Sequence, residues 1–172
     1  MKGCMVVIKT VTTRLAAETD IEVLRIIYNQ GIEDRIATLE TETKNHAYMQ
    51  DWFINHQGRY GVIVAEIEGM IAGWASLNQY SPRAAYDGVA SLSIYIHRDF
   101  RGKGVGSHLL QAIEQFARQN DFYKIVLFTF PHNEMAQSLY RKNGYREVGI
   151  FHNQGKLDGK FIDIMAMEKC FV

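Results

Sequence analysis

The sequence predicts an α/β fold with one central sheet and helices on both of its faces, built as a single domain over residues 1–172. Two observations predict it. Apolar runs typical of strands alternate with amphipathic helix patterns along the chain, and the glycine-rich stretch "RDFRGKGVG" joins one such run to a helix. A chain of 172 residues suits one domain, since two domains would each be unusually small.

In the first half of the chain, a strand is expected over residues 5–11, where β-branched residues are frequent. Apolar residues at helical spacing follow in residues 19–32, behind a capping Thr19 or Asp20. A second helix pattern comes near residues 49–56. The next two apolar runs flank Glu68 and Gly69, a pair that predicts a tight antiparallel hairpin.

The second half is expected to continue as strand, helix, strand, helix and two final strands. "DGVASLSIYIHRDF" forms the first of these strands, and the helix after it begins near Gly104. "YKIVLFTF" is an almost unbroken apolar run, typical of a strand covered on both faces. A helix capped by Asn133 and ended by Gly144 comes next. "REVGIF" and "FIDIMAMEKCF" are the last strands, with "HNQGKLDG" as a loop between them.

Composition excludes several classes of protein. The hydrophobic fraction of 47% and the charged fraction of 22% indicate a packed core rather than disorder. A formal net charge of zero disfavours a broad nucleic-acid surface. The N-terminal apolar run is too short for a signal peptide or a membrane span, so a cytoplasmic location without membrane association is expected. Cys4 and Cys170 are expected to be passive thiols.

The stretch "RDFRGKGVG" has the composition of an anion-binding turn. The first N–H groups of a helix lack internal partners, and the helix dipole adds positive potential there. Glycine backbone at 102, 104 and 106 lets a ligand approach closely, and Arg101 and Lys103 add charge. The spacing matches neither GxxxxGK[ST] nor GxGxxG, so the turn predicts a pyrophosphate site without identifying the ligand.

"RGKGVG" resembles the [QR]-x-x-G-x-[GA] signature of the GCN5-related N-acetyltransferases, the GNAT superfamily. "NEMAQSLYRKNGYREVG" is similar to the next block of that family. "IYNQGI", "ATLETE", "RAAY" and "GKLDGKFIDIMAM" recur in order in its phosphinothricin and methionine sulfone acetyltransferase subgroup. The resemblance extends from Ile26 to Met167 and implies a mostly antiparallel mixed sheet with one splayed parallel strand pair.

The resemblance implies acetyl-CoA as the donor of an acetyl group and no metal. Backbone N–H groups of the glycine-rich turn are expected to bind the pyrophosphate, and the strand before it to pair with the pantetheine arm. Asn133 is expected both to contact that arm and to cap its helix. The cofactor-binding residues expected on these grounds are Ile94, Tyr95, Ile96, Arg101, Gly102, Lys103, Gly104, Val105, Gly106, Ser107 and Asn133.

Tyr140 matches the tyrosine that resembles a general acid for the leaving thiolate, and a backbone N–H near Ile94 is expected to stabilise the thioester oxygen. The subgroup carries a glutamate base where this chain has Ser91. Three explanations are open: water held by Ser91 relays the proton, one of three other carboxylates is the base, or activity is weak. The candidate carboxylates are Glu40, Glu42 and Asp87.

The acceptor side is expected to include Arg83, Tyr86, Ser91 and Ser93, with Arg83 pairing with a carboxylate or phosphinate. Lys156 and Lys160 are further candidates. The six histidines are scattered without metal-binding spacing. The sequence therefore predicts a homodimeric acetyltransferase for the α-amine of a small amino-acid-like molecule. The alternatives are a CoA-binding regulatory protein with weak catalysis, and an acetyltransferase for a protein amine or a polyamine.

Overall fold

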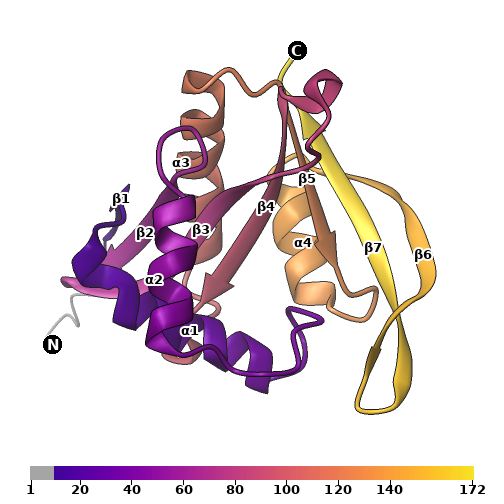
Figure 1. Cartoon of the computed structure of the whole chain (residues 1–172), viewed down its shortest axis with the longest axis horizontal. Helices are drawn as coiled ribbons and strands as arrows, with labels where there is room; N and C mark the ends of the chain where they lie inside the picture. The colour runs from indigo at the N-terminus through magenta and orange to yellow at the C-terminus, as the bar shows by residue number, and fades with distance from the viewer. Residues whose placement is uncertain (1–9) are drawn as a thin grey trace, which may run out of the picture.

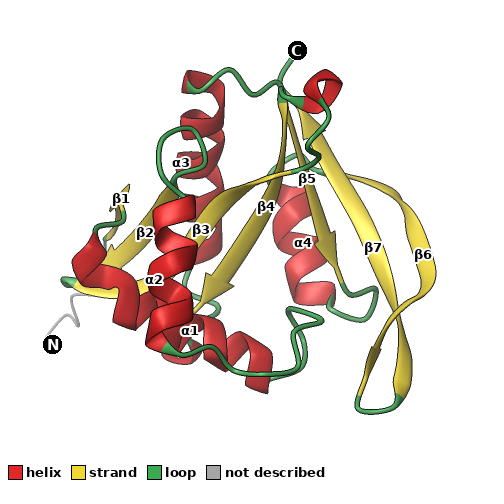
Figure 2. Ribbon diagram, viewed as in Figure 1, coloured by secondary structure: helices red, strands yellow, loops and turns green. Residues whose placement is uncertain are grey.

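A seven-stranded sheet runs through residues 10–172, which are the residues that the computed structural model describes (Figures 1 and 2). The strand order is β1-β2-β3-β4-β5-β7-β6. All neighbours are antiparallel except β4 and β5, which are parallel. The mixed, mostly antiparallel sheet is therefore confirmed. The strands are β1 Val11–Leu15, β2 Val62–Ile67, β3 Met70–Gln79, β4 Val89–Ile96, β5 Lys124–Thr129, β6 Arg146–Leu157 and β7 Lys160–Cys170.

The parallel pair separates half-way along its length. Residues 89–92 of β4 pair with residues 124–127 of β5. Beyond that point, Ser93 to Ile96 pair only with β3, while Phe128 and Thr129 pair only with β7. The expected splayed pair is thus present, and it leaves one edge of β4 unpaired just before the glycine-rich turn.

Helices cover both faces of the sheet. Figure 2 shows α1 and α2 in front of the strands and α3 and α4 behind them. Trp74 of β3 anchors the front core, and its ring N–H donates to the backbone oxygen of Leu24 at 3.2 Å, so the buried indole is satisfied. The rear core contains Leu109, Ile113 and Leu127. The helices are α1 Ile21–Glu33, α2 His46–Asn55, α3 Val105–Gln119 and α4 Glu134–Lys142; short 3-10 turns are η1 Glu18–Asp20, η2 Ala84–Tyr86 and η3 Arg98–Phe100.

Several local signals act as the sequence predicts. Glu68 and Gly69 both have positive φ, 53° and 78°, as a two-residue turn between β2 and β3 requires. The Asn133 side chain accepts from the N–H of Ala136 at 3.1 Å and caps α4, and Gly144 follows its end with φ 88°. Asp20 precedes α1, but its carboxylate accepts from the N–H of Ala17 and pairs with Arg14 instead of capping that helix.

The expected strand 5–11 and the expected loop 152–159 have different outcomes. Residues 5–9 of the expected first strand, like Cys4, lie outside the described residues, and β1 begins only at Val11. The expected loop 152–159 is wrong, because β6 continues to Leu157 and turns at Asp158 and Gly159. β6 is an edge strand with mostly exposed side chains, so polar residues are compatible with strand pairing there.

Cys170 is a free, exposed thiol at the end of β7. Within residues 10–172, no helix is both long enough and apolar enough to cross a membrane.

Gly73 allows β3, β4 and α3 to approach closely. A Cβ at this position would lie 2.8 Å from the backbone oxygen of Tyr95 and 3.2 Å from Leu109. Gly73→Ala should therefore lower the free energy of unfolding by about 1–3 kcal/mol through overpacking. The matched control is Gly149→Ala, where a Cβ would meet nothing within 4 Å. Denaturant unfolding of both variants checks this, and equal stability of the two would contradict it.

Candidate active site

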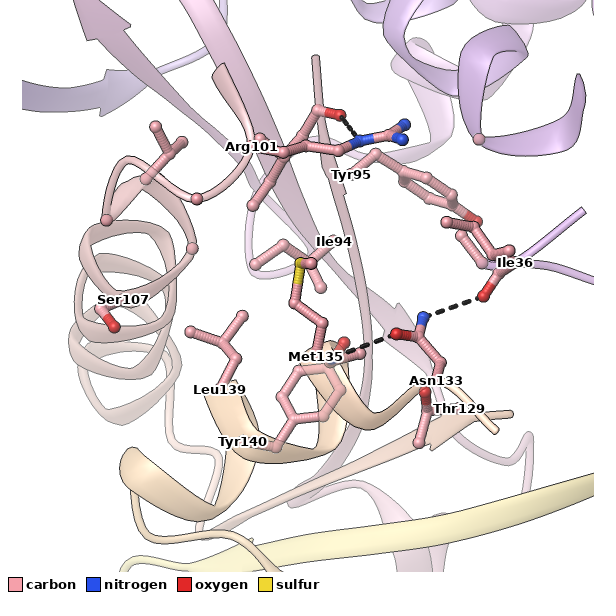
Figure 3. A pocket seen from close by; sticks show the side chains of 18 of the residues that line it. Ile36, Ile94, Tyr95, Arg101, Ser107, Thr129, Asn133, Met135, Leu139 and Tyr140 are labelled. Atoms are coloured by element: carbon pink, nitrogen blue, oxygen red, sulfur yellow. Dashed lines mark hydrogen bonds between the residues drawn. The ribbon is translucent and has the colours of Figure 1, made fainter. Parts of the chain in front are cut away.

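Two neighbouring cavities open where β4 and β5 separate. The first, the loop cavity, lies between the end of β4, the turn at 101–107 and the start of α4 (Figure 3). The second, the hairpin cavity, lies between the middle of β4, residues 37–39, the end of β5 and the β6–β7 hairpin. The two cavities are adjacent, because six residues line both of them. The shared residues are Ala37, Ile94, Tyr95, Phe128, Thr129 and Tyr140.

The turn that closes the loop cavity has the backbone of an anion site. Gly102 and Gly104 have φ of 73° and 80°, a conformation that favours glycine. A Cβ at either residue would meet no atom within 4 Å, so this backbone borders open space. α3 begins at Val105, and its first N–H groups lack intrahelical partners. Residues 102–107 therefore fit a pyrophosphate.

Gly106 has a different reason to be glycine. A Cβ there would lie 2.6 Å from Leu139 of α4, so Gly106 permits close packing of α3 against α4. It still lines the loop cavity, together with Val105 and Ser107. The sequence predicts that all three glycines let a ligand approach the backbone. In the structure, Gly102 and Gly104 border open space, whereas Gly106 allows α3 to pack against α4.

The cations near the turn are already paired. Arg101 lines the loop cavity, donates to the backbone oxygen of Ile96 at 3.3 Å and pairs with Asp34 at 2.6 Å. Asp34 also pairs with Arg98 at 2.7 Å. Burial alone raises the pKa of Asp34, but hydrogen bonds from Arg98 and Arg101 outweigh it and hold that pKa below its ordinary value. Lys103 does not line the cavity; its ammonium donates to the backbone oxygen of Asp99.

β4 and α4 supply the walls. Ile94 and Tyr95 line both cavities and Ile96 lines the loop cavity, beside the unpaired edge of β4. Burial raises the pKa of Tyr95 to about 12, against the effect of hydrogen bonds with Thr38 and Tyr28.

Asn133 lines the loop cavity, and its side chain makes two hydrogen bonds. Besides capping α4, it donates from Nδ2 to the backbone oxygen of Ile36 at 2.9 Å (Figure 3). The expected cap is present, and the same side chain binds the segment whose next residue, Ala37, lines both cavities.

Tyr140 projects from α4 into the shared wall, next to Ile94 and Leu139 (Figure 3). It is 6% exposed, and burial raises the pKa of its hydroxyl. A phenol with a raised pKa stays protonated across the neutral range, so it can supply a proton. Its ring packs edge-on against the ring of Tyr145, with the two ring centroids 5.9 Å apart.

The hairpin cavity contains Ser91 and Ser93 but no charged side chain among the described residues that line it. None of the three candidate carboxylates lines either cavity. Glu40 pairs with Lys44 at 2.5 Å, and Asp87 pairs with Arg59 at 2.8 Å.

The structure does not bring Arg83 and Tyr86 to the cavities. Both lie in the β3–β4 connection, where Tyr86 packs against Tyr80, and neither side chain lines the loop cavity or the hairpin cavity. Lys156 and Lys160 do not line one either; the Lys156 ammonium lies 5.3 Å from the ring centroid of Phe161.

Other lining residues were missed by sequence reasoning. They include Thr38, Leu39, Phe130 and Gln154. The "ATLETE" block was the available signal for the first two. Gln154 was assigned to a loop, which hid the curvature of β6 that brings it to the cavity.

Comparison with known proteins decides the family. The model of the Acetyltransferase (GNAT) family matches residues 24–145. The chain belongs to this family. A protein of Bacillus subtilis, YwnH, is provisionally assigned as a phosphinothricin acetyltransferase. It is 37% identical to this chain, and the alignment covers 91% of this chain and 96% of YwnH. The L-methionine sulfoximine/L-methionine sulfone acetyltransferase of Pseudomonas aeruginosa is 27% identical over 90% and 91%.

A solved structure supports the same conclusion. A GNAT phosphinothricin acetyltransferase of Sinorhizobium meliloti, in complex with acetyl-CoA, superposes with a TM-score of 0.88 at 26% identity, covering 94% of this chain and 88% of the other. This GNAT chain is an acetyl-CoA-dependent N-acetyltransferase, and its loop cavity fits the cosubstrate. Among residues 10–172, no group of three or more His, Cys, Asp or Glu could hold a metal.

Asp34 puts a negative charge next to Arg101, which lines the loop cavity. Asp34→Asn should release Arg101 and tighten acetyl-CoA about threefold, and the effect should shrink at high salt. Titration calorimetry at two ionic strengths measures this. Asp87→Asn, which removes the partner of Arg59 far from both cavities, is the control. Weaker binding in Asp34→Asn would mean that the ion pair is needed to shape the site.

Proposed function

We propose that this GNAT enzyme acetylates the α-amine of a small amino-acid-like acceptor of the phosphinothricin, methionine sulfone or methionine sulfoximine type, by direct attack, with residues 1–172 acting as one domain. The observation that carries the proposal is the wall shared by the two cavities at Ile94 and Tyr140. A cosubstrate in the loop cavity and an acceptor in the hairpin cavity would meet there. The relatives named for these acceptors support the choice of substrate class.

In the loop cavity, backbone N–H groups from Gly102 to Ser107 bind the pyrophosphate, and Arg101 adds charge. The unpaired edge of β4, from Ile94 to Ile96, pairs with the pantetheine arm as an additional strand would. Asn133 closes the other side of the arm. Lys103 contributes only to the positive potential, since it lies outside the cavity lining.

Acetyl-CoA supplies an activated acetyl group as a thioester. The backbone N–H of Ile94, at the shared wall, stabilises the developing negative charge on the thioester oxygen. The Tyr140 hydroxyl donates a proton to the leaving sulfur. Burial raises the Tyr140 pKa, so the hydroxyl is protonated when the reaction begins.

The attacking amine has to lose a proton first. Of the three explanations for Ser91, the geometry favours the water relay, because Ser91 lines the hairpin cavity and no carboxylate does. Water held by the Ser91 hydroxyl and nearby backbone carbonyls takes the proton to solvent. The neutral fraction of the amine can also react without a dedicated base, so the relay does not have to be efficient.

The two rival functions have less support. A polyamine site should be acidic, whereas the lining of the hairpin cavity carries no charge among the described residues. A purely CoA-binding role leaves unexplained the second cavity that continues past Tyr140.

We also propose a homodimer in the cytoplasm, where acetyl-CoA is available, without a nucleic-acid or membrane partner. Large apolar side chains are exposed on the three strands at one edge of the sheet. A second copy that covered them would also bring its own surface to the open side of the hairpin cavity. Sedimentation equilibrium tests the dimer. The exposed residues are Phe128, Val148, Ile150, Phe151 and Phe161.

Tyr140→Phe should lower kcat about 100-fold with little change in the KM for either substrate, because only the proton donor is removed. Tyr145→Phe removes a buried hydroxyl that lines neither cavity, and it should leave kcat near the wild-type value. Steady-state kinetics of both variants measure the difference. Equal kcat for Tyr140→Phe and the wild type would refute the acid role.

The acceptor class is tested by CoA release with phosphinothricin, methionine sulfone, ordinary amino acids and spermidine as a function of pH. Turnover is expected with the first two acceptors. The rate should climb toward the pKa of the amine, since no carboxylate lines the site, and it should not fall up to about pH 10, since Tyr140 stays protonated. Turnover of spermidine alone would support the polyamine alternative, and acetyl-CoA binding without turnover the regulatory one.

A further inference from the structure

A chain of polar side chains interrupts the apolar face of the sheet beneath α2. Trp74, Val62 and Val64 make this face of β2 and β3 hydrophobic. Two residues further along β3, Ser76 is 0% exposed, and Asn78 follows it. Buried polar groups cost stability unless they are satisfied, and a hydrophobic replacement is often no worse for stability. Their presence here therefore calls for a second purpose.

Hydrogen bonds fix the orientation of Asn78. Its Nδ2 donates to the backbone oxygen of Ser91 at 3.2 Å and to the hydroxyl oxygen of Ser93 at 3.1 Å. The Ser91 carbonyl can only accept, so Nδ2 has to face it, and Oδ1 has to face the other way. Oδ1 then accepts from the Ser76 hydroxyl at 3.3 Å and from Nε2 of His56 at 2.7 Å.

His56 is held in place by Trp52, one turn earlier in the helix. The two rings stack with centroids 4.0 Å apart, and Nδ1 of His56 lies 2.7 Å from the backbone oxygen of Trp52. Both ring nitrogens therefore face oxygen acceptors, and the imidazole donates to both at once only when each nitrogen carries a proton. His56 is half-buried at the end of α2. The polar chain thus starts at a clamped imidazole near the surface and ends at Ser93.

Ser93 lines the hairpin cavity. Because its oxygen already accepts from Asn78, its own O–H remains as a donor, and a hydroxyl that accepts one hydrogen bond donates a stronger one. An amino-acid acceptor needs donors for its carboxylate. No cationic side chain lines this cavity among the described residues, so neutral donors have to bind that group.

We infer that Asn78, oriented by His56, positions the Ser93 hydroxyl to donate a hydrogen bond to a carboxylate oxygen of the acceptor. Ser93 contacts the acceptor, and Asn78 and His56 act through it as positioning residues. The inference rests on the proposed function and adds to it the group that binds the carboxylate. It assigns a role to His56 and Asn78, which no motif in the sequence singles out.

The test is a double-mutant cycle in the full chain, with KM for L-methionine sulfone measured at saturating acetyl-CoA. Ser93→Ala should raise this KM about tenfold, the loss of one hydrogen bond to a charged group, and leave the acetyl-CoA Kd unchanged. His56→Leu should raise KM in wild-type protein but have no further effect in Ser93→Ala, because its influence passes through Ser93. His56→Gln, which keeps an N–H donor, should restore most of the lost affinity.

A second acceptor identifies the group that Ser93 binds. This second acceptor is the amine analogue of methionine sulfone that lacks the carboxylate. Ser93→Ala and the wild type should have the same KM for it. An equal penalty with both acceptors, or additive effects of His56→Leu and Ser93→Ala, would overturn the inference, since a merely structural role gives additive effects.

Two further measurements distinguish a failure of this inference from a failure of the proposed function. Turnover of methionine sulfone by the wild type tests the function alone. Independently of turnover, the side-chain amide NMR signal of Asn78 in CoA-loaded protein should shift when methionine sulfone binds and should stay in place in Ser93→Ala. Binding without such a shift in the wild type would overturn the inference.

Discussion

The separation of β4 from β5 is the constraint on which the rest of the structure depends. Parallel pairing ends at Leu92 and Leu127, and each strand then pairs with one other neighbour only. An unpaired strand edge buried in protein would leave backbone N–H and C=O groups unsatisfied, so it has to meet either solvent or a ligand. The glycine-rich turn and α3 follow directly, and they place an anion site at the end of that edge. In the proposed function, strand pairing, acyl transfer and phosphate binding would follow one another along β4 and the turn after it.

The two cavities differ in the charge of the residues that line them. Asp34 shares its carboxylate between Arg98 and Arg101 at the rim of the loop cavity. In the hairpin cavity, the lining residues among 10–172 are neutral, and polar side chains of β3 and β4 meet there. Such a lining would leave the amine of the proposed acceptor without a strong counter-charge, which lowers the cost of its deprotonation.

The features predictable from sequence were those with local causes. Strand and helix order, the Glu68–Gly69 turn and the Asn133 cap follow from short-range propensity, and the glycine-rich turn has a backbone that only glycine adopts easily. The sequence predicts that β6 ends at Phe151, because the residues after it have the polar composition of a loop. An exposed edge strand tolerates such polar residues, and β6 continues to Leu157. Arg83 was expected on the acceptor side because of its chemistry and the resemblance of its segment, and in the fold it lines neither of the two cavities. His56 and Asn78 are 22 residues apart and meet only after the sheet has formed.

The wall that the two cavities share has a consequence for the length of the acyl group. Ala37, Ile94 and Phe128 line both cavities, and in the proposed reaction the transferred group would lie beside them. A donor with a longer acyl chain would therefore extend into the space that the acceptor needs. Donor length and acceptor size are then not independent properties of this protein. Enlarging the wall residues would favour short chains and small amines together, and trimming them would relax both limits at once.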